Sequence, residues 1–119
     1  MELKPAKSSP RLENNILKWY HNDSFSIEWS FSLTWDEEPY MLDENDELIF
    51  SFFKFLEKEP VHTFSFTNVQ DNSVSLDFTE EISKKFTPGV YTYCVKLNTH
   101  DGPIVTLYAK QRAEVEKCH

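Results

Sequence analysis

The stretch FTPGVYTYCVKL, residues 86–97, decides the fold class of this chain. Its proline-glycine pair forms a turn, and the strand after it places alternate side chains on one face. In two-sheet sandwiches, a tyrosine at the start of the strand that follows a crossing often hydrogen-bonds back to the backbone. We expect Tyr91 to form this corner; the alternative is a strand that merely contains two tyrosines. The residues on the expected core face are Tyr91, Tyr93, Val95 and Leu97.

A second strand pattern lies upstream, in FSIEWSFSLTW, residues 25–35. Apolar residues alternate with Ser, Glu and Thr along the whole segment, a period of two that puts them on one face of a strand. An α-helix would distribute the same residues around its axis. The expected face consists of Phe25, Ile27, Trp29, Phe31, Leu33 and Trp35.

Further strand candidates follow at short and fairly regular spacing, which favours a sandwich or barrel over alternating strands and helices. Asp71-Asn72 and Asp101-Gly102 are turn pairs, and each predicts a hairpin between the strands that flank it. The remaining candidates are residues 16–20, 46–56, 62–69, 73–78, 90–98, 103–110 and 112–118.

One short helix is expected over residues 79–86, with Thr79 as its N-cap and with Ile82 and Phe86 one turn apart. The pattern as a whole predicts an all-β fold: an immunoglobulin-like antiparallel β-sandwich of seven or eight strands, with this helix at the crossing between strands E and F. An antibody-type domain has a cysteine where this chain has Tyr93, so the likeness is to the architecture alone.

The expected domain covers residues 15–119, preceded by a flexible polar arm over residues 1–14. The formal net charge is −8 without a basic cluster, which disfavours nucleic acids and anionic membranes as partners. No apolar run approaches the roughly 20 residues that span a bilayer, and no secretory signal is visible. We therefore expect synthesis in a cytoplasm and reduced thiols at Cys94 and Cys118, whose separation the sequence does not fix.

No residue pattern predicts a catalytic, cofactor-binding or metal-binding residue, so we expect a protein that is not an enzyme. Nucleophilic catalysis needs a Ser or Cys beside a His and an orienting acid, and no motif of that kind is present. The terminal Cys118-His119 pair lacks the other ligands of a zinc site. The four histidines are His21, His62, His100 and His119.

Two binding sites remain as alternatives to purely structural roles. The acidic cluster over residues 43–47 has the oxygen ligands that Ca²⁺ prefers, but a solvated loop is the simpler interpretation. Trp19, Trp35 and Tyr40 could form an aromatic platform for a carbohydrate, although large aromatic residues in a small sandwich mostly pack the core.

The strand over residues 46–56 is apolar on both faces towards its end. Leu48, Phe50 and Phe52 share one face, and the other carries Ile49, Phe53 and Phe55. Because a sandwich normally exposes a polar outer face, the Phe53/Phe55 face predicts contact with another copy of the chain or with other proteins.

The order of these motifs is similar to that of a known family. NDSFSIEWSFSL, LDENDELIFSFFK and FTPGVYTYCVKLNTHDGPIVTLY follow one another as in the N-terminal immunoglobulin-like domain of phage baseplate upper proteins and of small prophage-encoded proteins. The resemblance covers residues 16–116, with Asn22-Asp23 where the family often has Gly-Asp. It implies a structural or assembly module of a phage tail or baseplate, made in the bacterial host cytoplasm and acting either as a virion component or as an assembly factor. It brings no catalytic residues. The alternative function is a carbohydrate- or receptor-binding module.

Overall fold

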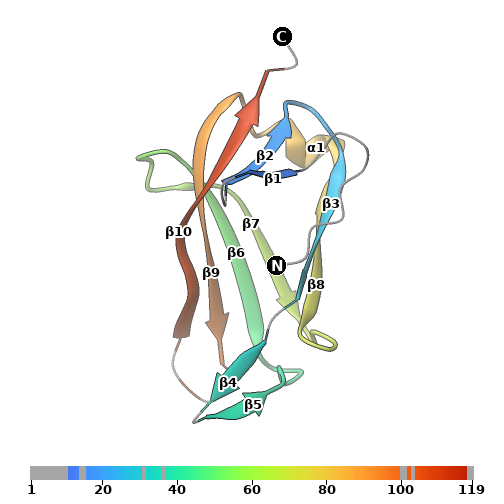
Figure 1. Cartoon of the computed structure of the whole chain (residues 1–119), viewed down its shortest axis with the longest axis vertical. Coiled ribbons are helices and arrows are strands. Elements are labelled where there is room, and N and C mark those ends of the chain that lie inside the picture. The colour runs from blue at the N-terminus through green and yellow to red at the C-terminus, as the bar shows by residue number, and fades with distance from the viewer. Residues whose placement is uncertain are drawn as a thin grey trace.

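The computed structural model describes residues 11–13, 16–30, 32–35, 37–99, 102 and 104–117. These residues form an all-β sandwich with one short helix, as the sequence predicts (Figure 1). Residues 1–10 of the predicted arm lie outside the described part, whereas residues 11–13 form a short strand.

The larger sheet contains six strands in the order β1-β2-β10-β9-β6-β7. Its strands are β1 (Arg11–Glu13), β2 (Ile16–Tyr20), β10 (Ile104–Glu116), β9 (Gly89–Asn98), β6 (Glu47–Lys54) and β7 (Pro60–Thr67). All neighbours are antiparallel except β2 and β10, which are parallel. The prediction of an entirely antiparallel sandwich is therefore wrong for this pair, because the chain leaves β2 for the other sheet and does not turn back in a hairpin.

The second layer contains β3 (Phe25–Ser30) paired with β8 (Ser73–Phe78), and a separate hairpin joins β4 (Leu33–Trp35) to β5 (Glu38–Tyr40). The described residues thus form more strands than the seven or eight expected. The predicted strand over residues 25–35 ends at Ser30, because the next residues pair with β5 around a turn in which Glu37 has a positive φ of 67°. Phe31 lies outside the described residues.

The hairpin predicted at Asp71-Asn72 is wrong, because the chain crosses between the two sheets there. Asp71 and Asn72 do form a turn, with φ values of 54° and 51°, but β7 pairs with β6 and β8 pairs with β3. The turn therefore carries the chain from one sheet to the other and does not close a hairpin. The buried Asn72 side chain holds this crossing: Oδ1 accepts from the Leu42 N–H (2.9 Å), and Nδ2 donates to the Tyr40 carbonyl (2.9 Å).

Helix α1 (Glu80–Ser83) lies at the crossing from β8 to β9, as predicted, although it is a single turn and ends before Phe86. Thr79 caps it, and the Thr79 Oγ1 accepts a hydrogen bond from the Ile82 N–H at 3.3 Å. Phe86 follows the helix, and its side chain is fully buried.

The predicted tyrosine corner is confirmed. The hydroxyl group of Tyr91 donates to the backbone carbonyl of Thr87 at 2.7 Å. Gly89 lies between them with a φ of 149°, a conformation that a side chain would strain. The corner thus fixes the start of β9, and its alternate residues Tyr91, Tyr93, Val95 and Leu97 are buried as expected.

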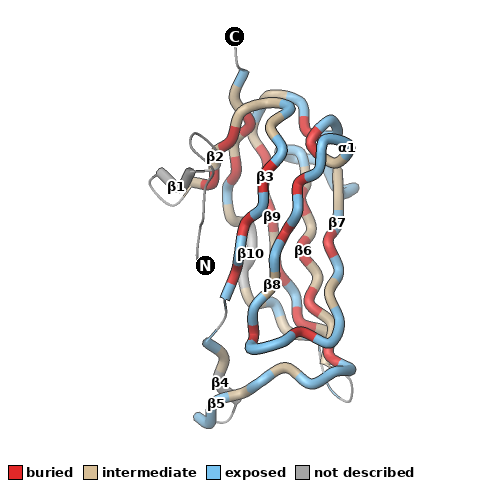
Figure 2. Tube along the Cα trace, turned by 90° about the vertical axis from the view of Figure 1, so that its right-hand side faces the viewer, coloured by how far each residue is buried: buried red, intermediate tan, exposed pale blue. Residues whose placement is uncertain are grey.

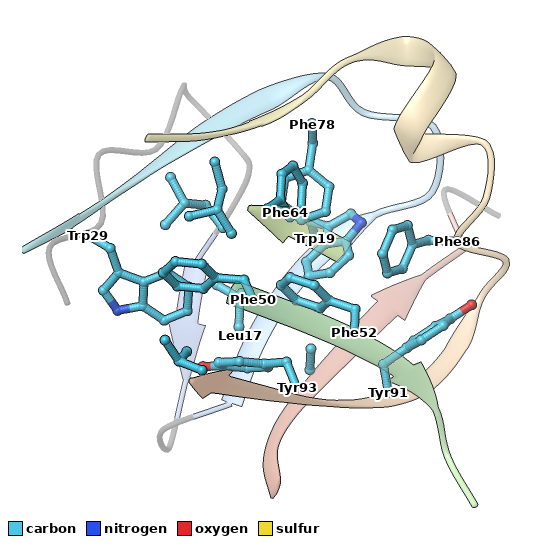
Figure 3. Close-up of a cluster of buried hydrophobic side chains, with 14 of the residues drawn as sticks. Leu17, Trp19, Trp29, Phe50, Phe52, Phe64, Phe78, Phe86, Tyr91 and Tyr93 are labelled. Atoms are coloured by element: carbon cyan, nitrogen blue, oxygen red, sulfur yellow. The ribbon is translucent and has the colours of Figure 1, made fainter. Parts of the chain in front are cut away.

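Aromatic rings fill the space between the layers. Buried and exposed residues alternate along the strands (Figure 2), and the rings lie between the β3–β8 layer and the larger sheet (Figure 3). The indole N–H groups of Trp19 and Trp29 are buried without a hydrogen-bond partner, which typically costs about 1–3 kcal/mol each. The buried aromatic residues are Trp19, Phe25, Trp29, Phe50, Phe52, Phe64, Phe78, Phe86, Tyr91 and Tyr93.

The corner can be tested with Tyr91→Phe, which removes the hydroxyl group and keeps the ring. We expect the free energy of unfolding to fall by about 1 kcal/mol, the typical net value of one hydrogen bond, measured by urea denaturation. Thr87→Val is the comparison, since it removes only the longer contact between the Thr87 and Tyr91 hydroxyl groups (3.4 Å) and keeps the backbone carbonyl that accepts the bond. An equal loss in both variants would contradict the corner.

Candidate interaction surface

The structure separates the two residues expected to form one apolar face. Strand β6 ends at Lys54, so Phe53 lies within the strand and Phe55 lies in the turn that follows. Phe53 is half-buried, whereas Phe55 is 56% exposed. A hydrogen bond from the Phe55 N–H to the Val90 carbonyl (3.0 Å) ties the turn to β9. The expected continuous Phe53/Phe55 strand face is therefore not formed.

Leu56 is the most exposed large apolar residue of the described chain, at 86%. It follows Phe55 in the β6–β7 turn, which the Glu57 N–H closes by donating to the Lys54 carbonyl (2.9 Å). Its φ of 68° is a left-handed conformation that costs a leucine free energy and that Asn or Gly would adopt more readily. We call Phe55 and Leu56 the apolar turn. Neither burial nor local backbone preference explains Leu56 at this position.

Two other exposed apolar residues lie at the opposite end of the sandwich from the apolar turn. Met41 follows β5 and is 59% exposed, and Ile104 begins β10 and is 65% exposed. The β4–β5 hairpin marks this end in Figure 1. The apolar turn is therefore a separate surface.

Two of the three aromatic residues considered for carbohydrate binding, Trp19 and Tyr40, are held within the fold. Trp19 is fully buried in the core, where its ring lies 5.2 Å from that of Phe78 and 5.6 Å from that of Phe86. Tyr40 is half-buried, and its hydroxyl group donates to the Asp46 carboxylate. The Trp35 side chain lies outside the described part of the structure.

The acidic loop over residues 43–47 is organised by Asp46, which is only 1% exposed. Its Oδ2 accepts from the Tyr40 hydroxyl group (2.5 Å) and from the Asp43 N–H (2.9 Å). Asp46 therefore has a structural role in shaping the loop, which the sequence interpretation of a solvated loop did not include. Within the described ranges, no three acidic, His or Cys side chains are grouped to hold a metal ion.

The described histidines are parts of the fold. The Nδ1 atom of His21 donates to the Phe86 carbonyl (3.0 Å), which joins the β2–β3 loop to the end of the helical crossing. Cys94 is a half-buried free thiol on β9. His100, His119 and Cys118 lie outside the described residues.

His62 lies on β7 beside an ammonium group. Lys85 Nζ donates to His62 Nδ1 (3.3 Å), and the edge of the imidazole ring packs against Phe64 with ring centres 4.6 Å apart. Burial, and secondarily the Lys85 charge, lower the pKa of His62 below its ordinary value of 6.5. His62 is therefore a neutral packing residue at neutral pH.

Comparison with protein-family models, curated proteins and solved structures found no match for this chain. Among the described residues, no helix is long and apolar enough to cross a membrane.

The environment of His62 predicts a pH dependence. Because its folded-state pKa is lowered, the stability contributed by the neutral ring is present above pH 6.5 and is lost as pH falls through the folded-state pKa. Lys85→Met should raise the pKa of His62 but leave it below 6.5, since burial is the larger cause. An NMR titration of the imidazole checks this, with Lys84→Met as the control. A pKa that is unchanged in Lys85→Met would contradict the contact.

The apolar turn predicts an unusual stability change. Leu56→Asn should raise the free energy of unfolding by up to about 1 kcal/mol, because Asn tolerates the left-handed conformation and little packing is lost. Leu56→Ala keeps the left-handed cost and should leave stability within about 0.5 kcal/mol of the natural chain. Thermal or urea unfolding measures both. A loss in Leu56→Ala clearly greater than about 0.5 kcal/mol, or a loss in Leu56→Asn, would show that Leu56 has a packing role.

Proposed function

We propose that this chain is a non-enzymatic structural or assembly module of a phage or prophage tail or baseplate particle, made in the bacterial host cytoplasm. The observation that carries the assembly role is the apolar turn, where a left-handed Leu56 is held almost fully in solvent. A partner that covers Leu56 would explain why the chain has a leucine at a position where it is unfavourable for the isolated fold. The assignment to a phage particle is supported by the order of the sequence motifs.

The apolar turn has the properties of an anchor for docking. Hydrogen bonds from the Phe55 and Glu57 amides hold the turn against β9 and close it. Two adjacent large apolar side chains are thereby presented on a rigid support, so little conformational entropy is lost when a partner covers them. We place the contact at Phe55 and Leu56, with the half-buried Phe53 at its margin. The partner is another structural protein of the particle or another copy of the chain.

Mass spectrometry of purified particles tests this proposal. We expect induction of the culture that encodes the chain to yield phage-like particles that contain it at a fixed ratio to the other tail proteins. Particles that form normally without the chain would contradict a role as a particle component.

Two variants connect that result to the apolar turn. Leu56→Asn should reduce incorporation into particles, although the variant is expected to be at least as stable as the natural chain. Met41→Asn is the matched control, because Met41 is also an exposed apolar residue but lies at the opposite end. Equal incorporation of the two variants would exclude the apolar turn as the docking surface.

A further inference from the structure

The small sheet leaves strand edges without partners. Within the described chain, β3 and β8 pair only with each other, over six residue pairs from Phe25–Phe78 to Ser30–Ser73. Strand β2, which precedes β3, pairs with β10 in the larger sheet. Each strand of the small sheet therefore has one edge that no described strand covers. Unpaired backbone N–H and C=O groups at such an edge can template another strand.

The edge of β8 carries one charged residue, Asp77, and lacks the other devices that normally block such pairing. Its sequence, SVSLDF, contains no Pro, Gly or Lys, and its pairing with β3 shows no register shift. The edge strand β7 does have such devices. It begins at Pro60, and its register with β6 shifts at Phe53. The charged Lys85 side chain also lies against His62 of this strand. At the other edge of that sheet, β1 has only three residues.

We propose that β8 pairs antiparallel with β8 of a second copy of this chain, about a two-fold axis at Ser75. This pairing would join the two small sheets into one four-stranded sheet with the strand order β3-β8-β8-β3. In this register Ser75 faces its own mate, Ser73 faces Asp77 and Val74 faces Leu76. No like charges meet along the edge. Each pair joins two outward-facing or two inward-facing side chains, so the exposed and buried faces of the two small sheets stay continuous.

The side chains of β8 suit this pairing. Asp77 Oδ1 already accepts from Ser26 across the strand pair (2.7 Å) and from Ser75 (3.2 Å), whereas its Oδ2 accepts no hydrogen bond from the described residues. Ser73 of the second copy would supply a donor to that oxygen. On the inner face, Val74 is only partly buried, so the added strand would complete its burial.

The size of the contact sets the expected affinity. A six-residue strand is about 20 Å long, and one strand–strand contact buries less than the roughly 1,200 Å² of a stable interface. The dimer should therefore be weak and concentration-dependent. The inference concerns β8, on the opposite layer from the apolar turn, and it does not depend on the proposed phage function.

Analytical ultracentrifugation of the full chain tests the proposal. The sedimentation coefficient should rise towards that of a dimer between roughly 10 μM and 1 mM. Ser75→Lys should weaken the dimer roughly fivefold or more, because two ammonium groups would face each other across the axis. In the monomer the new side chain faces Glu28 on β3, so the fold is retained.

Ser65→Lys is the matched control, since it adds the same charge to an exposed serine beside a carboxylate, that of Glu47, but on β7, away from the β8 edge. It should leave the dimer unchanged. A monomer at every concentration, a dimer that survives or is strengthened in Ser75→Lys, or equal weakening by both substitutions would overturn the proposal.

A measurement on the natural chain avoids any effect of the variants on folding. Amide NMR spectra recorded at increasing protein concentration should shift for residues 73–78 more than for β7 or the apolar turn. Shifts confined to Phe55 and Leu56 would show that the copies meet at the apolar turn and would overturn pairing at β8.

Discussion

The ring of Phe52 is the contact on which the sandwich depends, because it joins both layers and the crossing between them. Phe52 projects from β6, the strand next to the β7 edge of the larger sheet, and is fully buried. Its ring packs edge-on against Phe78 of β8 and against Phe86, which follows α1, and stacks with Tyr93 of β9. Aromatic pairs of this kind add specific geometry to the burial of apolar area. This cluster therefore connects β6 and β9 of the larger sheet with β8 and with the crossing that follows α1.

Most of the fold could be predicted from the sequence because its signals are local. The alternation in β3 and β9 sets which side chains face inward, and Pro88-Gly89-x-Tyr91 sets the corner. The choice of strand partners depends on residues far apart in the sequence. The errors in strand length and strand pairing arise for this reason. The alternating residues after Ser30 satisfy a continued strand and a hairpin equally well, and the Asp71-Asn72 turn does not specify whether it joins strands of one sheet or of two.

The candidate surface was less predictable for a related reason. The apolar character of Phe55 was visible, but its exposure depends on β6 ending at Lys54, and the left-handed backbone of Leu56 depends on the turn closed by Glu57. The roles of Asp46 and Asn72 need tertiary contacts, since each holds a segment that only the folded chain brings near. Nothing in the sequence distinguishes these two residues from the exposed acids and amides around them.

The parallel pairing of β2 with β10 has a consequence for the order of folding. Leu17 lies beside Ala113, so nearly the whole described chain separates two neighbouring residues of one sheet. During synthesis β2 emerges first, but it cannot take its place in the sheet until β10 has left the ribosome. Contacts between residues so distant in sequence form slowly. Until then β2, which carries the buried Leu17 and Trp19, has not joined β10 in the larger sheet, and the nascent chain exposes this strand to chaperones or to aggregation.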